Sequence, residues 1–270
     1  MTFFDASSYY RSMECPVSKL IKAIAPVSRK QRELAQREEL ILDSAQNILH
    51  EQGYSYLTMD RVAEAVEYSK GTIYNHFSSK EDMVCSLCCR SINNLINMFT
   101  RAAEYKGTSR ERFSAIGIGY SLYHQAHPMT AQNVQIIKIN AVREKISDAK
   151  LAEMESLEQR IIEIALDVVK EAISCGDLPK ETSPIANGIV FGVWSMYFGA
   201  LILEHSDIPL QDLGFSPTVQ LLWLNTQKFL DGYNWLPLSS DTDNEAMFNK
   251  ISSDLYANEI EIINKRKKQS

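Results

Sequence analysis

The stretch "TMDRVAEAVEYSKGTIYNHFSSKEDM", residues 58–83, contains two short amphipathic patterns that meet at a break near Glu67 and Tyr68. Thr58 stands directly before the first pattern, and Ser69 stands directly before the second. Both residue types cap helices, because their side-chain oxygens accept hydrogen bonds from backbone amides of the first turn. The sequence therefore predicts two short helices joined by a tight turn, the second running from Ser69 to about Phe77.

The second predicted helix is unusually rich in polar and aromatic side chains. Four apolar residues would hold the two helices together: Val62, Ala63, Val66 and Ile73. Five residues would then face outward: Lys70, Thr72, Tyr74, Asn75 and His76. Two short helices packed on a preceding helix make a helix-turn-helix motif, whose second helix can enter the major groove of DNA. The alternative of a solvated surface helix fits Tyr74 and Phe77 poorly.

The charge of this region limits how it could bind DNA. The whole chain of 270 residues has a net charge of −6, and residues 28–82 hold seven basic and ten acidic side chains, a net charge of −3. Binding must then depend on where groups are placed, because the domain has no general attraction for polyanions. Helix N-termini at Thr58 and Ser69 offer amides to phosphates at no cost in net charge. Lys70, Lys80 and the stretch "SRKQR", residues 28–32, would supply the salt-sensitive share of affinity.

Helical periodicity dominates residues 34–232, and the predicted fold class is all-α. A long helix from about Ser79 to Tyr105 would link two domains. We divide the chain into an extension (1–34) that is disordered or a DNA-contacting arm, a helix-turn-helix domain (35–95), a larger helical domain (96–236) and a polar tail (237–270). That tail has a weak helical pattern and the basic end "KRKK", residues 265–268, and disorder is the default expectation for it.

Other functional classes receive little support from the sequence. Cys85, Cys88 and Cys89 share a helix face, but zinc needs four ligands and no second pair has a recognisable spacing, so packing is expected and no metal or cofactor is assigned. His124 and His127 are expected in a pocket or at the surface, and a pH or metal role for them stays open as the minor alternative. Gly117 and Gly119 form only a fragment of a phosphate-loop pattern. No catalytic constellation is recognisable, so we expect the protein not to be an enzyme.

Residues 185–203, "IANGIVFGVWSMYFGALIL", are apolar enough to span a membrane by length. Burial inside a helical dimer interface is the preferred interpretation, because Asn187 and Ser195 interrupt the stretch and no basic cluster flanks it. The odd number of cysteines and the lack of a secretory signal favour the reducing cytoplasm. A membrane-anchored sensor and a pure interaction protein remain the alternatives from other classes.

The run from about Arg37 to Phe99 closely resembles the amino-terminal domain of the TetR family of bacterial transcriptional regulators. Matching elements are Gly53 after the first helix, Thr58 at the start of the second, residues 73–77 "IYNHF" in the recognition helix, and Lys80-Glu81 at the start of the fourth. The resemblance implies a homodimer that binds a near-palindromic DNA operator, usually as a repressor released by a small-molecule ligand. Activation of transcription stays open, since it would use the same parts.

Residue roles follow from the resemblance position by position. The implied DNA-binding residues are Thr58, Ser69, Lys70, Gly71, Thr72, Tyr74, Asn75, His76 and Lys80. Two departures put the turn geometry and the role of the arm in doubt: Glu67 and Tyr68 occupy a turn where small residues are common in relatives, and the extension before Ser28 is longer than usual.

The larger domain would hold the effector and the twofold partner. Six residues could line an apolar cavity with a few polar groups: Tyr120, Tyr123, His127, Met154, Trp194 and Tyr197. The last two long helices, near residues 184–204 and 216–231, would form the dimer interface through Phe191, Trp194, Phe198, Leu221, Leu222 and Trp223. The predicted partners are thus an operator, a second copy of the chain and an unidentified small molecule, with no membrane.

Overall fold

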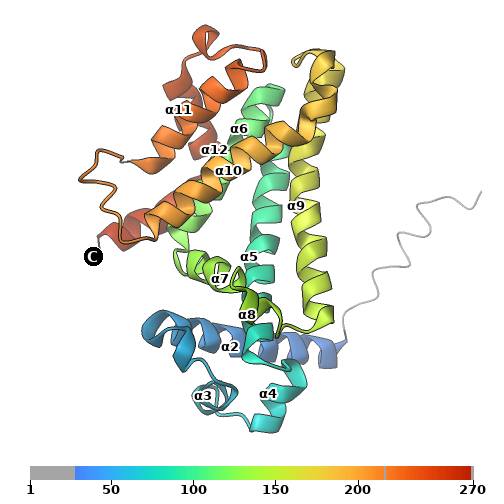
Figure 1. Cartoon of the computed structure of the whole chain (residues 1–270), viewed down its shortest axis with the longest axis vertical. Helices are drawn as coiled ribbons and strands as arrows, with labels where there is room; N and C mark the ends of the chain where they lie inside the picture. Colours follow the sequence, from blue (N-terminus) through green and yellow to red (C-terminus); the bar gives the residue numbers. More distant parts are fainter. Residues whose placement is uncertain (1–27, 216, 269–270) are drawn as a thin grey trace, which may run out of the picture.

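The structure is a computed structural model that describes residues 28–215 and 217–268. Within those ranges it contains helices and turns and no strand, which confirms the predicted all-α class. Figure 1 shows a small domain of α2, α3 and α4 at one end of a taller helical bundle. The predicted extension lies mostly in residues 1–27, outside the described residues.

Helix α2 (Arg29–Gln52) begins earlier than predicted, so the boundary drawn at residue 34 is wrong. Ser28 and Gln31 form a reciprocal capping box, in which the Ser28 hydroxyl accepts from the Gln31 amide and the Gln31 side chain accepts from the Ser28 amide. The "SRKQR" stretch is therefore the exposed first turn of a helix. The sequence conceals this start because the first two turns carry almost no apolar residue.

Helices α3 (Met59–Ala65) and α4 (Lys70–His76) are the two short helices that the capping residues predict. Thr58 accepts a hydrogen bond from the Arg61 amide, and Ser69 accepts one from the Thr72 amide. Their inner faces pack on α2 in a core that contains Ile41, Leu57, Val62, Ile73 and Phe77, all nearly or fully buried. The apolar residues thus fix one side of α4 in the core and leave its other side exposed.

Helix α5 (Lys80–Ala103) is shared by the two domains. Its first half, including Met83, Val84 and Leu87, lies in the core of the small domain. Its second half, including Leu95 and Phe99, lies in the core of the bundle. The longest helix, α9 (Asp148–Cys175), packs along it. Because one continuous helix is buried in both cores, the two domains are joined by more than a linker.

The rest of the bundle surrounds the almost wholly buried helix α6 (Ser109–Ala126). It comprises α7 (Met129–Ile137), α8 (Asn140–Arg143), α10 (Ala186–Glu204) and α11 (Thr218–Asp231), with short 3₁₀ turns at Lys180–Ile185 and Ser239–Asp241. A further 3₁₀ turn, Tyr54–Tyr56, lies between α2 and α3 in the small domain. Gly117 and Gly119 serve packing inside α6, because a Cβ at either would lie 2.6 Å from the side chain of Tyr197 or Tyr256.

The predicted polar tail is not a tail. Helix α12 (Asn244–Lys267) packs on α6, with Ile251 and Tyr256 fully buried. The Tyr256 hydroxyl donates a hydrogen bond of 2.8 Å to the Ala115 carbonyl. The sequence signal is weak because polar residues separate the apolar ones and the helix is kinked at Tyr256, which shifts the apolar face between its two halves.

Arg110 ties α6 to α11 and to the chain that follows α11. Its guanidinium is 1% exposed and donates to the Gln227 side chain, the carbonyls of Gln227 and Trp235, and the Asp231 carboxylate at 2.8 Å. Burial alone would raise the pKa of Asp231, but hydrogen bonds from Ser239 and the Arg110 charge outweigh it and lower that pKa to about 2. A buried charge held by several hydrogen bonds in this way is costly to disturb.

The turn between α3 and α4 is a Schellman motif with an unusual residue. The Tyr68 amide donates to the Ala63 carbonyl and the Glu67 amide to the Glu64 carbonyl. Glu67 takes the left-handed conformation, with φ of 56°. Glycine is the usual residue at that position, because a Cβ is strained there. This is the physical reason why small residues suit the turn.

We expect Glu67→Gly to raise the free energy of unfolding by about 1 kcal/mol, because it removes the Cβ from a left-handed position. Urea denaturation measures the change. Glu67→Gln is the matched control, since it removes the charge and keeps the Cβ, and it should have little effect. Equal stabilisation by both variants would assign the effect to charge and refute backbone strain.

The Asp231 network predicts a dependence of stability on pH. A carboxyl with a folded-state pKa of about 2, against 3.8 in an unfolded chain, stabilises the fold by roughly 2 kcal/mol above pH 4 and loses this as pH falls toward 2. Asp231→Asn should therefore lower the free energy of unfolding by at least that amount at pH 6. Its deficit should shrink by about 2 kcal/mol as the pH is lowered to about 2, whereas exposed Asp167→Asn should behave as wild type at both.

Candidate nucleic-acid interface and effector cavity

Helix α4 lies at one end of the molecule (Figure 1). Ile73 is fully buried and fixes the helix, while the Tyr74 side chain is 55% exposed on the opposite side. Gly71 and Asn75 are also exposed, and Thr72 and His76 are placed at the first and last turns of the helix. Hydroxyls of Ser69 and Thr72 lie 2.9 Å apart at the first turn. The residues predicted to face DNA are therefore on the surface, on a helix fixed from behind.

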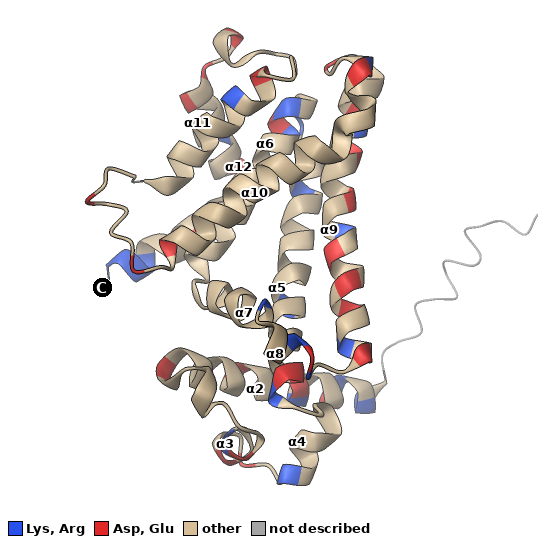
Figure 2. Ribbon diagram, in the orientation of Figure 1, with Lys and Arg blue, Asp and Glu red and all other residues tan. Residues whose placement is uncertain are grey.

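Lys70 is already paired in the absence of DNA. Its ammonium lies 2.7 Å from the Asp60 carboxylate of α3, and that pair raises the pKa of Lys70. Both side chains are more than half exposed, so water screens their attraction and the pair contributes little to stability. A phosphate could therefore replace Asp60 at small cost. Lys70 is the first residue of α4, and Figure 2 shows one end of that helix coloured as basic.

Lys80 is held at the start of α5 by Tyr54. Its ammonium lies 4.0 Å from the centre of the Tyr54 ring and donates to the Tyr54 carbonyl at 3.3 Å. The Tyr54 hydroxyl in turn donates to the buried Glu81 carboxylate at 2.9 Å, and burial raises the pKa of Tyr54. Lys80 is thus a half-buried, positioned cation beside the helix-turn-helix, and Glu81 has a structural role.

Two polar contacts fasten the small domain to the bundle. The Asp82 carboxylate of α5 accepts from the Ser78 hydroxyl and, at 2.8 Å, from the Ser147 amide just before α9. On the other side, the buried side-chain amides of Gln46 in α2 and Asn133 in α7 bond each other reciprocally. The orientation of the recognition helix therefore depends on the positions of α7 and α9.

An apolar cavity of about 210 Å³ lies between α5, α6, α7, α9 and α10. Four of the six residues predicted to line it do so: Tyr120, Met154, Trp194 and Tyr197. Tyr123 and His127 do not. Tyr123 is buried with its hydroxyl accepting from Asn94, and His127 stands one turn further along α6, at its end. The prediction was wrong about these two because it selected residue types and did not follow the helical register.

The register of α6 identifies what was missed. Phe113, Ile116, Gly117, Tyr120 and His124 follow one another at intervals of one, three or four residues and all line the cavity. Glu158 of α9 lines it as well, and its half-buried side chain carries a negative charge to the cavity wall. Glu158 did not stand out in the sequence, since a single glutamate in a helix usually has no special role, whereas a pocket or the surface was the expected place of His124.

The face predicted for dimerisation is only partly on the surface. On α10, Phe191 is 63% exposed and Trp194 44%, and Leu224 on α11 is 53% exposed. Phe198 and Leu221 are half-buried. Leu222 and Trp223 instead lie in the bundle's own core, so their assignment to an outward interface is wrong. Leu222 and Trp223 point inward because the helical register of α11 places them on the side that packs in the bundle core.

Helix α10 and the turn before it, Lys180–Glu204, are long and apolar enough to cross a membrane by length and composition, and this is weak evidence for such a role. The helix packs on α6, α9 and α11. Cys85, Cys88 and Cys89 are buried in the small domain's core, and burial raises the pKa of Cys88 and keeps its thiol protonated. Among the described residues no group of histidine, cysteine and acidic side chains has the geometry of a metal site.

Comparisons of sequence place the small domain among known proteins. Residues 41–87 match "Bacterial regulatory proteins, tetR family". Over 80 residues the chain is 29% identical to the HTH-type transcriptional activator FasR of Mycolicibacterium smegmatis, covering 30% of this chain and 36% of that protein. Over 55 residues it is 40% identical to the HTH-type transcriptional repressor AcnR of Corynebacterium diphtheriae, covering 20% of this chain and 29% of that protein. The chain thus matches about a third of these relatives' length.

A comparison of structures extends over more of the chain. The TetR family transcriptional regulator PfmR from Thermus thermophilus superposes with a TM-score of 0.55 at 18% identity. The match covers 71% of this chain and 97% of that one, and at this identity it shows a shared fold. By sequence, residues 41–87 belong to the tetR family of bacterial regulatory proteins, and over most of its length the chain shares the fold of a TetR family regulator.

Proposed function

We propose that this protein is a cytoplasmic, homodimeric transcriptional regulator that binds a near-palindromic DNA operator through α4 and is released from it by a small molecule. The observation that carries the proposal is the exposure of Tyr74 and Asn75 on a helix whose other side is fixed in a core by Ile73. Asparagine can bond both donor and acceptor of adenine in the major groove, and a tyrosine can pack against bases or phosphates. Repression is the preferred mode, and activation remains the alternative.

The proposed DNA surface works without a basic domain. The first turns of α3 and α4 begin at the exposed caps Thr58 and Ser69, where backbone amides can meet phosphates. Lys70 and Lys80 add two positive charges at the edges of α4. Affinity from so few charges should depend less on salt than that of a strongly basic protein. Specific contacts would therefore carry a large share of the binding.

Dimerisation through α10 and α11 would bring two copies of α4 to the spacing that DNA requires. Successive major grooves on one side of the duplex are about 34 to 36 Å apart, so a regulator of this design needs a partner that sets the distance. The exposed Phe191, Trp194 and Leu224 supply the apolar area for such a contact. A ligand in the cavity between α5, α6, α7, α9 and α10 would then favour a form with a different spacing.

The DNA-binding role predicts a selective loss of affinity. In gel-shift titrations with DNA flanking the protein's own gene, Asn75→Ala and Tyr74→Ala should each weaken specific binding by roughly tenfold or more, as expected for lost base contacts. Asn47→Ala is the matched control, because Asn47 is exposed on α2 away from α4. Binding of both α4 variants at wild-type strength, or no specific binding by the wild type, would refute the proposed interface.

The dimer interface predicts a change in assembly. Phe191→Glu would place a charge in the exposed apolar face of α10, and burying it between two copies is unfavourable. We expect sedimentation equilibrium to show a dimer for the wild type and a monomer for this variant. Leu34→Glu, at another exposed apolar position on α2, should remain dimeric. A wild type that sediments as a monomer would overturn the homodimer.

A further inference from the structure

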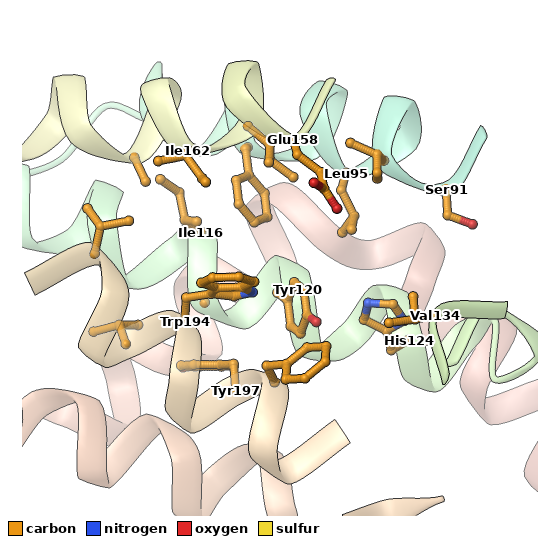
Figure 3. Close-up of a pocket in the computed structure, with 18 of the residues that line it drawn as sticks. Ser91, Leu95, Ile116, Tyr120, His124, Val134, Glu158, Ile162, Trp194 and Tyr197 are labelled. Atoms are coloured by element: carbon orange, nitrogen blue, oxygen red, sulfur yellow. The ribbon is translucent and has the colours of Figure 1, made fainter. Parts of the chain in front are cut away.

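The polar groups of the cavity are gathered toward one part of it. Figure 3 shows Glu158, Tyr120 and His124 around one half, while Ile116, Ile162 and Trp194 surround the other. A cavity with one polar and one apolar half suits an amphipathic molecule. What the polar groups can donate or accept therefore indicates the chemistry of the ligand's head.

His124 offers an acceptor. Its Nδ1 lies 2.8 Å from the Thr130 hydroxyl, and that hydroxyl already donates its only proton to the His127 carbonyl. Nδ1 must therefore carry the ring proton and donate it to Thr130. Burial, with a smaller contribution from His205 and His127, lowers the pKa of His124 to about 3, so the ring is neutral. Its Nε2 is then a bare acceptor, and it has no hydrogen-bond partner among the described residues.

Glu158 offers a second acceptor with a negative charge. It forms no ion pair or hydrogen bond with any described residue, although several other acidic side chains of α9 do. Figure 3 shows its carboxylate turned toward the cavity. Lys138 is the only cation among the lining residues, and it is exposed at the end of α7, where its ammonium can stay in water.

Aromatic rings complete the polar half. The Tyr120 ring lies 4.6 Å from His124 and 6.3 Å from Tyr197, edge-on to both. The Tyr120 hydroxyl has no hydrogen-bond partner among the described residues, and Trp194 also lines the cavity (Figure 3). Aromatic faces close to an unpaired carboxylate attract organic cations through the ring quadrupole and the charge together. An organic anion would meet two acceptors and no buried cation.

We propose that the cavity binds a small amphipathic amine, whose protonated head donates hydrogen bonds to Glu158 and to Nε2 of His124 and whose apolar body lies against Ile116, Ile162 and Trp194. The volume of about 210 Å³ limits the body to one ring or a short chain, since a cavity of roughly 150 Å³ holds benzene and drug-sized ligands need about 300 Å³ or more. This inference rests on the proposed function only in taking the cavity as the regulator's effector site.

Three probes that share a phenyl ring and differ in their heads test the proposal: 2-phenylethylamine, 2-phenylethanol and phenylacetate. Each is titrated into the full-length protein without DNA, with binding followed by calorimetry and by tryptophan fluorescence, to which Trp194 contributes from the cavity wall. We expect the amine to bind most tightly, the alcohol about tenfold more weakly, and phenylacetate most weakly. Tighter binding of phenylacetate than of the amine, or no binding of any probe at millimolar concentration, would overturn the proposal.

Substitutions assign the effect to the named groups. Glu158→Gln should weaken amine binding about tenfold and leave the alcohol unchanged, while Glu163→Gln, at an exposed position of the same helix, should change neither. Lys138→Gln should not weaken amine binding. Undiminished amine binding by Glu158→Gln would reject the assigned counter-charge.

Gel shifts without probe keep the two proposals separate. If the ligand-free protein does not bind the operator, the proposed regulatory function is refuted and the probe titrations remain valid. Conversely, intact operator binding with the wrong order of probe affinities refutes only the ligand class. Addition of the amine to the protein–operator complex then shows whether occupation of the cavity releases DNA, which is the expected result.

Discussion

Helix α5 is buried in two hydrophobic cores, and this constraint governs how the rest of the molecule can work. Its first half packs with the helix-turn-helix through Met83 and Leu87, and its second half packs with the bundle through Leu95 and Phe99. Interiors are close-packed, so a helix fixed at both ends transmits displacement instead of absorbing it. Leu95 and Phe99 also line the cavity. Whatever fills the cavity therefore bears on the helix that carries the DNA-binding domain.

A second connection runs through α7 and is made of hydrogen bonds. Nδ1 of His124 bonds Thr130 in the first turn of α7, and Asn133 one turn later bonds Gln46 of α2. Val134 and Ile137 of the same helix line the cavity. The Gln46–Asn133 pair is buried, so its geometry is strict: separation of the two amides leaves polar groups without partners in an apolar interface. Small displacements of α7 thus favour a discrete second arrangement over gradual loosening.

Local signals were sufficient for α3 and α4, whereas the bundle depended on packing that the sequence does not display. Thr58 and Ser69 marked the starts of α3 and α4, because capping is a property of a few neighbouring residues. The inward positions of Leu222 and Trp223 and the fold of α12 depend on partners far along the chain. Only part of the cavity lining was predicted, because aromatic residues such as Tyr120 and Trp194 are recognisable candidates in a sequence and a lone glutamate such as Glu158 is not. Which residues of α6 line the cavity became clear only from the packing of that helix.

The proposed DNA-binding surface and the cavity of this protein differ in chemistry. The DNA-binding domain has a net negative charge, yet its exposed helix starts and the weak Lys70–Asp60 pair allow phosphates to approach, since little stability is lost when that pair breaks. In the cavity the opposite holds, because Nε2 of His124 is a buried acceptor without a partner in an apolar wall. A buried unpaired acceptor is unfavourable until a donor reaches it. A ligand that carries a donor would therefore gain this free energy on binding, and through α5 and α7 its binding can shift the position of α4.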